Sequence, residues 1–382
     1  MRRWVVLAVG TFVQTSQAAA YAGLAVIAPD LRDRFDLSLT QIGALFGVSG
    51  VGGLLTLLAW GIAADRVGER LTATVGLLGA AGGLSAAALA SSYATLLVFL
   101  FLATALSAST NTATGRAVTS WFPRGERGFA LGIRQTAIPL GGFSAAFALP
   151  PIVDHGGSRA ALLALAGFAL AAALAAAATM TEGPVRLVED EADALRHPLR
   201  DGRIWRLSSG SAILVLTQAT VTGFVVLFLE SQRGFSHGAA AAVLGGMNAI
   251  AIVGRLGGGR LSDRIGSRVE LMRRISLGTA LFVGAVAALV GASPWLLVPA
   301  LVVGGGLSMS WNALSVAATV EAVGPRRSGA ALGLQQTMLQ VAIVLAPLAF
   351  APFVAATSWR AGFAAAAACP LAAVVVLRRL GR

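Results

Sequence analysis

Apolar residues recur along this chain in runs of about 20, and short polar segments separate the runs. A helix of this length reaches across the hydrocarbon core of a bilayer, so each run predicts one membrane-spanning helix. We expect twelve such helices, near 4–28, 39–63, 70–90, 93–119, 127–152, 158–180, 205–230, 237–261, 270–291, 295–320, 328–356 and 359–379.

One long hydrophilic segment interrupts the pattern of apolar runs. It covers 182–204 and carries several acidic residues among its arginines. We interpret it as a cytosolic linker between a six-helix bundle at 1–181 and a second at 205–382. The predicted fold class is therefore an all-α membrane protein, with twelve transmembrane helices in two pseudo-symmetric six-helix bundles.

Composition excludes a soluble protein of this size. Of the 382 residues, 56% are hydrophobic and 12% are charged, whereas soluble domains carry roughly 25% charged residues. The net charge of +12 does not indicate nucleic-acid binding, because every basic residue is arginine and most arginines separate apolar runs. Placing both termini in the cytosol puts 20 arginines on that side and five on the other, as expected for a multi-pass protein of a bacterial inner membrane.

The two halves of the chain share a ten-residue pattern. The first copy is G-x-x-x-D-R-x-G-x-R over 61–70, and the second copy lies at 259–268. Its fixed positions are Gly61, Asp65, Arg66, Gly68 and Arg70 in the first half, and Gly259, Asp263, Arg264, Gly266 and Arg268 in the second. Asn111 and Asn312 form a further matched pair. Repeats of this kind are typical of transporters built from two related halves.

The repeated pattern resembles the most specific motif of the major facilitator superfamily, and the resemblance covers the whole chain. It implies two six-helix bundles around a central cavity, with alternating access by rocking of the halves. The glycines at its start would let helices approach closely. The aspartates would pair with arginine and face a helix N-terminus of the other half, closing a cytosolic gate. We expect Arg116, near the cytosolic end of its span, to belong to this gate. The alternative is a structural helix cap.

Two arginines deep within spans are the strongest candidates for substrate binding. Arg134 and Arg255 lie about two turns into the fifth and eighth spans. A charge at this depth costs free energy, so each arginine is a candidate for a functional role. The family fold brings these spans together, so both guanidinium groups could hold one anion through paired hydrogen bonds. The alternative is that each side chain reaches toward the cytosol. No Asp or Glu lies in the middle of any span, which favours an anionic substrate.

Neutral polar residues complete the candidate cavity, and interhelical hydrogen bonding is the alternative for each of them. They are Gln14, Gln17, Tyr21, Asn111, Gln135, Gln218, Thr222, Asn248, Asn312, Gln335 and Gln336. The family resemblance implies that the first, fourth, seventh and tenth spans line the cavity.

Family branches differ in what they carry. The segments around Gly115-Arg116, Trp121-Phe122-Pro123 and Gly132-Ile133-Arg134 look like branches that move small anions such as cyanate, nitrate or organic acids. The exporter motif matches only in part, because Ile138 precedes Pro139 and one residue separates Pro139 from Gly141. We therefore expect a secondary transporter of a small anion, and keep a drug or metabolite efflux antiporter as the alternative.

Other classes of function fit the sequence poorly. The three histidines share no metal-ligand spacing, and no phosphate-binding loop is present, so we expect no metal, no cofactor and no catalytic site. A non-transporting receptor would leave two complete gate motifs unexplained. The expected partners are the lipid bilayer, the solute, and a coupling proton or counter-substrate, with the protein acting as a monomer.

Overall fold

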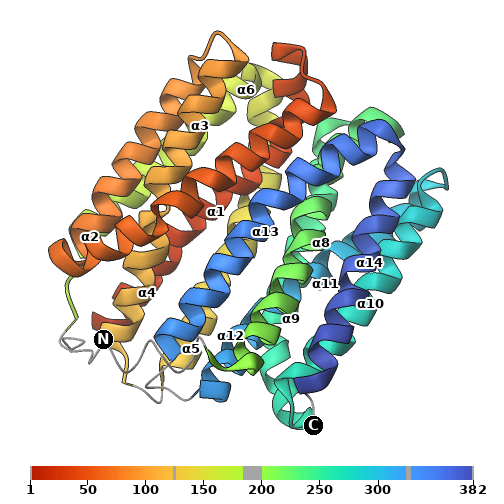
Figure 1. The fold of residues 1–382 in the computed structure, drawn as a ribbon. Coiled ribbons are helices and arrows are strands. Elements are labelled where there is room, and N and C mark those ends of the chain that lie inside the picture. The colour runs from red at the N-terminus through yellow and green to blue at the C-terminus, as the bar shows by residue number, and fades with distance from the viewer. Residues whose placement is uncertain (1, 124–125, 184–199, 324–327, 381–382) are drawn as a thin grey trace. The chain divides into compact units, whose positions relative to one another are not determined.

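The computed structural model describes residues 2–123, 126–183, 200–323 and 328–380, and every element in this part of the chain is a helix. The predicted all-α class is thereby confirmed. The helices in chain order are α1 (Arg2–Phe35), α2 (Leu39–Ala88), α3 (Tyr93–Ser107), α4 (Ser109–Trp121), α5 (Arg127–Gln135), α6 (Ala137–Thr179), α8 (Gly202–Arg233), α9 (His237–Ile265), α10 (Arg268–Leu289), α11 (Pro294–Ser310), α12 (Asn312–Val323), α13 (Ser328–Ala356), α14 (Trp359–Leu377) and the 3₁₀ helix η2 (Arg378–Leu380) (Figure 1).

Within the described residues, nine helices are long and apolar enough to cross a membrane. Two of them, Leu39–Ala88 with 50 residues and Phe129–Thr179 with 51, are about twice as long as one crossing requires. Each contains a glycine with left-handed backbone, Gly68 at φ 82° and Gly157 at φ 63°, and each covers two predicted spans. The first predicted span falls on α1, which is not among the nine, so the count of twelve stays a prediction.

The repeated motif ends in the same backbone geometry in both halves. Gly68 and Gly266 have φ angles of 82° and 75°, in the left-handed region that only glycine adopts without strain. The Gly266 amide donates to the Ser262 carbonyl at 2.9 Å, which closes the last turn of α9. The motif therefore ends one helix and redirects the chain, which explains the glycine at this position.

Contacts divide the chain into two compact units. The first contains Met1–Leu187 and Gly223–Gly245, and the second contains Val188–Thr222 and Gly246–Arg382. The C-terminal part of α8 and the start of α9 thus belong to the first unit, where the Phe224 ring meets Phe46 edge-on at 5.3 Å. The predicted division at a linker stays a prediction, and most of that linker, 184–199, lies outside the described residues.

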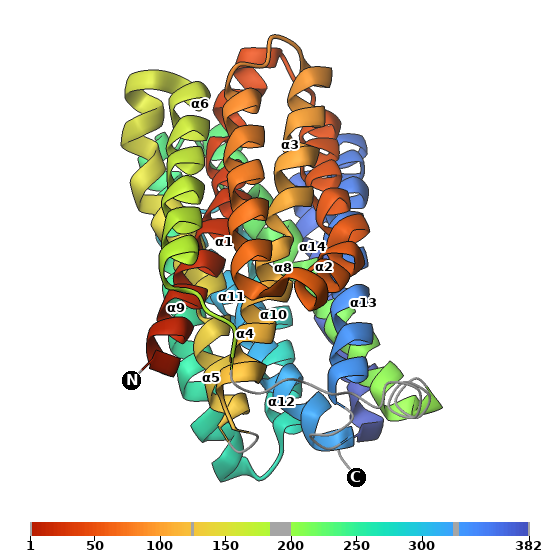
Figure 2. The ribbon, with the colours of Figure 1, turned by 90° about the vertical axis from the view of Figure 1, so that its left-hand side faces the viewer.

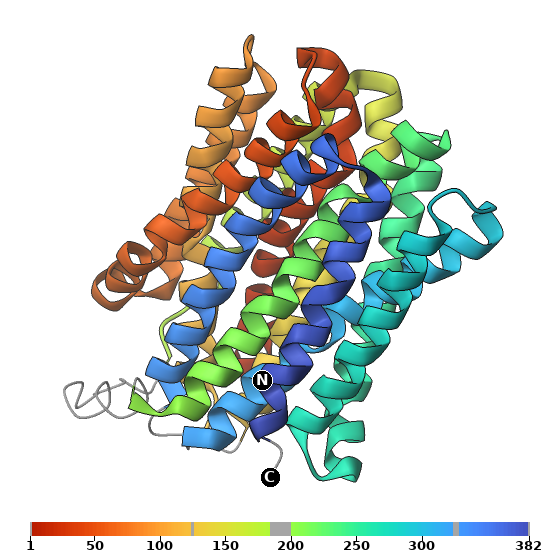
Figure 3. The same ribbon diagram turned by 45° about the vertical axis from the view of Figure 1, so that its right-hand side comes forward.

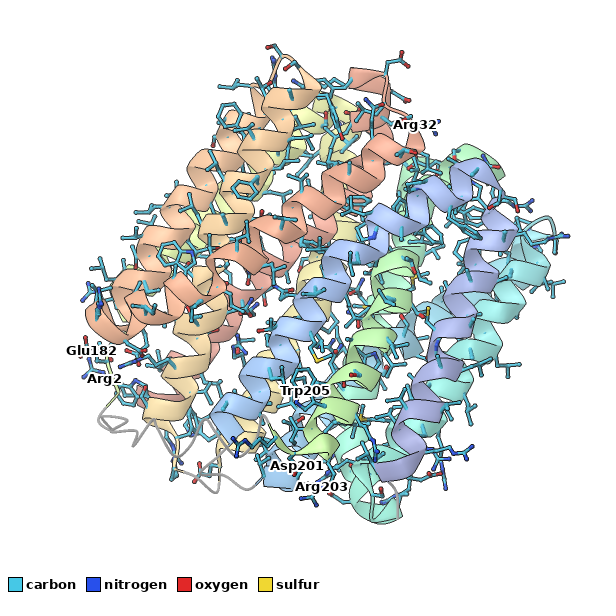
Figure 4. All side chains as sticks on the ribbon, viewed as in Figure 1. Arg2, Arg32, Glu182, Asp201, Arg203 and Trp205 are labelled. Carbon is cyan, nitrogen blue, oxygen red and sulfur yellow. The ribbon has the colours of Figure 1, made fainter. Side chains whose placement is uncertain are left out.

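The C-terminal end of the predicted linker forms a helix cap. Asp201, Arg203 and Trp205 lie at the start of α8 (Figure 4). The Asp201 carboxylate accepts from the Arg203 backbone amide at 2.8 Å and from its guanidinium at 3.0 Å. Hydrogen bonding to Arg203 lowers the pKa of the Asp201 carboxyl. An acidic N-cap satisfies a free amide and suits the positive end of the helix, so α8 begins here.

Small residues hold the helices of the first unit together. α2 and α3 run side by side, with α6 next to α2 (Figure 2). A Cβ atom at Gly52 would lie 2.6 Å from the Phe101 carbonyl of α3, and one at Gly141 would lie 2.6 Å from the Thr15 carbonyl of α1. Such contacts let helix backbones approach closely where the solvent provides no hydrophobic driving force.

In the second unit, glycine also allows two helices to approach closely, and large apolar side chains fill the centre. α10 lies beside α14 (Figure 3). Trp311, Met272 and Leu377 are buried in one apolar cluster of this unit. A Cβ atom at Gly304 would lie 3.1 Å from Phe282, so glycine also sets the approach of α11 to α10.

The predicted span 93–119 is not one uninterrupted helix, because α3 ends at Ser107 and α4 begins at Ser109. In a continuous helix the Ala105 carbonyl would accept from the amide four residues later. Instead it accepts from Trp60 Nε1 at 2.7 Å and from Thr56 Oγ1 at 2.8 Å, both on α2. Tertiary hydrogen bonds therefore compete with the helix ladder at the break.

The predicted spans 127–152 and 295–320 are divided in a similar way. Thr136 separates α5 from α6 and turns its hydroxyl back to the Ile133 carbonyl at 2.7 Å. Trp311 separates α11 from α12. Next to it the Met309 carbonyl accepts from Arg255 Nε at 3.0 Å and from Asn312 Nδ2 at 3.3 Å. In each case a polar side chain donates a hydrogen bond to a carbonyl that would accept from a backbone amide in a continuous helix.

Candidate functional site

Arg134 lies in the last turn of α5, with 9% of its surface exposed, inside a set of neutral acceptors. Its Nε donates to Thr114 Oγ1 at 2.7 Å. Its Nη2 donates to Gln14 Oε1 at 3.0 Å and to the backbone and side-chain oxygens of Asn111 at 3.0 and 3.1 Å. The acceptors come from α1 and α4, so three helices fix the direction of one guanidinium group.

The guanidinium of Arg134 is oriented but not neutralised. None of its hydrogen-bond acceptors in the described residues is a carboxylate, and none of the ion pairs found there includes it. Its Nη1 donates no hydrogen bond within the same part of the chain. A buried cation without a counter-charge is unfavourable, so a group held this way is suited to an anion that arrives from outside the protein.

The acceptors of Arg134 belong to a longer chain of polar side chains. Gln14 Nε2 donates to Gln17 Oε1 at 2.8 Å, and Thr110 on α4 donates to the same oxygen at 2.5 Å. Tyr21 continues the same face of α1, with 38% of its surface exposed. Sequence reasoning placed Gln17 and Tyr21 in the site. It named Gln14 with them as a cavity residue, and the spacing 14, 17, 21 puts all three on one helix face.

Arg255 lies on α9 with 5% of its surface exposed and donates from Nε to the Met309 carbonyl at 3.0 Å. Arg134 belongs to the first compact unit and Arg255 to the second. The expectation that both hold one anion therefore stays a prediction.

A second polar network in the C-terminal half follows the first at a constant sequence offset. Gln335 Nε2 on α13 donates to Ser315 Oγ at 2.8 Å and to Thr319 Oγ1 at 2.9 Å. Asn312 donates to Gln218 Oε1 at 3.2 Å. Gln335 and Ser315 stand 201 positions after Arg134 and Thr114, so the internal repeat extends to a hydrogen bond between matched helices. At these matched positions the N-terminal half has the charged Arg134, and the C-terminal half has the neutral Gln335.

The remaining predicted cavity residues differ in burial. Asn248 on α9 is 2% exposed, while Gln135 and Gln336 are half-buried. Of the two predicted neighbours Gln335 and Gln336, Gln335 takes the buried position that matches Arg134.

In the first copy of the repeated motif, Arg116 of α4 forms an ion pair with Asp65 of α2. Its Nε also lies 3.4 Å from Glu69 Oε1. Glu69 is 2% exposed and accepts from Ser120 Oγ at 3.1 Å. Sequence reasoning missed Glu69, which occupies an unspecified position of the motif. Its place between two fixed residues was the only available signal.

In the second copy, the central residue is Arg268 of the motif itself. Its Nη2 lies 2.6 Å from Asp263, and its Nε lies 3.1 Å from Glu321 of α12. Its Nη1 donates to the Gly259 carbonyl at 3.0 Å. The two copies thus use opposite partners. The first pairs its aspartate with an arginine of α4, and the second pairs its arginine with a glutamate of α12.

Two features of the motif lack partners among the described residues. A Cβ atom at Gly61 or Gly259 would meet no other atom there within 4 Å, so the expected close helix approach at these glycines stays a prediction. The close approaches lie elsewhere on the helices, where glycine faces a neighbouring backbone. Arg66, Arg70 and Arg264 take part in no ion pair among the described residues, so only part of each motif carries its polar contacts.

Residues 10–347 match the family model described as Major Facilitator Superfamily. An uncharacterized MFS-type transporter of Mycobacterium tuberculosis is 31% identical over 374 residues, which span 97% of this chain and 84% of that protein. A bacterial homologue of the human lysosomal transporter Spinster, solved in an inward-facing and unoccupied conformation, aligns with a TM-score of 0.79. That alignment covers 99% of this chain and 95% of the other at 18% identity, so the likeness is one of fold.

Two further relatives match about a third of this chain each. The hexuronate transporter of Bacillus subtilis is 30% identical over 121 residues, which span 32% of this chain and 29% of that protein. The probable nitrate/nitrite antiporter of Thermus thermophilus is 35% identical over 129 residues, which span 34% of this chain and 29% of that protein.

Proposed function

The chain belongs to the major facilitator superfamily, a family of membrane transporters and not of enzymes, and on this premise we propose that it carries a small anion across the membrane by alternating access. The observation that carries the proposal is Arg134, a guanidinium held by neutral acceptors from α1 and α4 with Nη1 uncommitted in the described part of the chain.

The proposed anion contacts follow from the hydrogen bonds that are already made. Asn111 Oδ1 accepts from Arg134, which leaves the amide nitrogen of Asn111 to donate elsewhere. Nη1 of Arg134 and Nδ2 of Asn111 would then both donate to the anion. Hydrogen bonds to an ionised acceptor are stronger than neutral ones, and here the anion would also neutralise the buried cation.

The names of two partial relatives support an anionic solute, because hexuronates are carboxylates and nitrate is an inorganic oxyanion. Arg255 would supply a second cationic contact from the other half during the transport cycle. The motif ion pairs around Arg116 and Arg268 would act as the cytosolic gate. We further propose twelve spans in a bacterial inner membrane, cytosolic termini, a monomer, and coupling to a proton or a counter-anion.

The test is solute exchange by purified protein in liposomes. A panel of sugar acids, simple carboxylates, nitrate-type anions and one lipophilic cation would be loaded on one side and supplied as tracer on the other. We expect exchange for at least one anion and none for the cation. Exchange of the cation alone would replace the proposal with the efflux antiporter.

A further inference from the structure

The turn that joins α8 and α9 packs as part of the first compact unit. This hairpin, Gly223–Gly245, clusters with residues 1–187 and not with the rest of the C-terminal half. The Phe224 ring meets Phe46 of α2 edge-on at 5.3 Å. A Cβ atom at Gly245 would lie 2.5 Å from the Phe147 ring of α6. The hairpin is therefore closely fitted against α2 and α6.

A histidine–glutamate pair spans the turn of this hairpin. His237 Nδ1 lies 2.7 Å from Glu230 Oε1, and the two side chains are 13% and 19% exposed. His237 Nε2 is shielded from water and has no hydrogen-bond partner in the described residues. Imidazole is the side chain that ordinarily changes charge near neutral pH, so this pair is the titratable element of the hairpin.

Two acidic side chains on neighbouring helices influence His237. Asp154 on α6 and Asp30 on α1 both act on it electrostatically. Asp30 is fixed in place because its Oδ2 accepts from the Ser158 backbone amide at 2.6 Å. No group of three or more possible metal ligands that could hold an ion occurs among the described residues.

Two arginines offset part of this negative charge. Arg34 acts electrostatically on Asp30, and its Nη2 donates to the Ala90 carbonyl at 2.8 Å. Arg159 donates to the Ala88 carbonyl at 3.2 Å. Both guanidinium groups are thus tied to the end of α2. On the hairpin itself the basic residues are Arg233, which is always charged, and His237, which is a cation only when protonated.

We propose that the Glu230–His237 pair is a proton-binding site that holds the hairpin 223–245 against α1 and α6. With a neutral imidazole, the hairpin presents the Glu230 carboxylate to Asp30 and Asp154, and like charges repel. With a protonated imidazole, the pair is internally neutralised and His237 attracts both aspartates. The hairpin therefore releases more readily as pH rises through the titration of the pair. This rests on the proposed function, because release of the hairpin would be part of alternating access.

The experiment measures the position of the hairpin without substrate. Spin labels at Ser92 and Gln232, both exposed and both in the first unit, report the distance between the α2–α3 turn and the hairpin in a cysteine-free protein. We expect the ratio of short to long distances to fall about five- to tenfold between about pH 5.5 and about pH 8.5, as loss of a partly buried charge contact implies.

Variants assign the effect to the pair. His237→Gln can still donate to Glu230 but does not titrate in this range, so the pH-dependent change should disappear while the protein stays folded. Glu230→Gln should weaken the change. His155→Gln is the matched control, because His155 lies exposed on α6 and its side chain hydrogen-bonds only with the Pro151 carbonyl in the described residues. An unchanged pH response in His237→Gln would overturn the proposal.

Transport assays on the same proteins separate the two claims. A wild type that shows the pH-dependent distances but exchanges no anion leaves the proton site standing and refutes the proposed substrate. A wild type that exchanges anions but shows the same distances at both pH values refutes the proton site alone.

Discussion

Substituting Arg134 by glutamine tests the anion site with the least damage to the fold, because the protein already uses this arrangement in its second half. Gln335, at the matched position, satisfies its amide with Ser315 at 2.8 Å and Thr319 at 2.9 Å. In Arg134→Gln, Thr114 and Asn111 remain available as partners for the new amide. The substitution removes the charge and keeps a polar side chain among polar neighbours.

The expected effect on stability is small. Arg134 donates four hydrogen bonds, and a glutamine can replace about two of them. Each net hydrogen bond contributes about 0.5–1.5 kcal/mol to the free energy of unfolding, but removal of an uncompensated buried cation offsets part of the loss. We expect the free energy of unfolding to change by less than about 2 kcal/mol.

The expected effect on binding is larger. A hydrogen bond to a charged group contributes about 1.5–3 kcal/mol. Since about 1.4 kcal/mol is a factor of ten, the Kd for the best anion should rise about 10- to 150-fold. The measurement is titration calorimetry on purified protein, with thermal unfolding of the same samples. Arg206→Gln, at an exposed arginine at the start of α8, is the control for loss of one positive charge. Equal anion affinity in wild type and a folded Arg134→Gln would refute the assignment.

Three further predictions follow from the fold and the motif. In a cysteine-free background, cysteines at Ser92 and Ser293 should react with an impermeant reagent from outside intact cells, and reaction only after permeabilisation would contradict the proposed topology. Asp65→Asn should leave the protein folded but lower the exchange rate, because it breaks the ion pair of the first motif copy, and normal exchange would show that the pair is structural. Gly266→Ala should destabilise the protein by about 1–2 kcal/mol because φ is 75°. Gly259→Ala should be neutral, because a Cβ atom there meets no described atom within 4 Å, and equal melting temperatures of the two variants would contradict the backbone argument.

The sequence predicted the helical class and the family because these depend on patterns that repeat along the chain. Runs of apolar residues define helices locally, and the two motif copies identify matched positions without reference to packing. The left-handed glycines Gly68 and Gly266 are the physical reason for one fixed motif position. The helix breaks could not be predicted, because the one at Ala108 depends on Trp60 and Thr56, nearly 50 residues earlier in the chain.

The candidate site could be predicted only in outline. A charged residue inside an apolar run is visible in the sequence, so Arg134 and Arg255 could be identified as buried arginines. Their partners are ordinary polar residues, and the role of each depends on which side chain it contacts in the folded protein. Glu69 was missed for this reason. Gln14 was predicted only as a cavity residue, since no local pattern separates a glutamine that orients an arginine from one that bonds a neighbouring helix.

The central claim is that buried arginines from both halves confer preference for an anion. The most direct measurement is the Kd of the best anionic ligand for wild type, Arg134→Ala, Arg255→Ala and Arg255→Lys, each purified and shown to be folded. We predict weaker binding in both alanine variants, with Arg255→Lys intermediate, because lysine keeps the charge but lacks the planar fork. Unchanged affinity in both alanine variants would contradict the account.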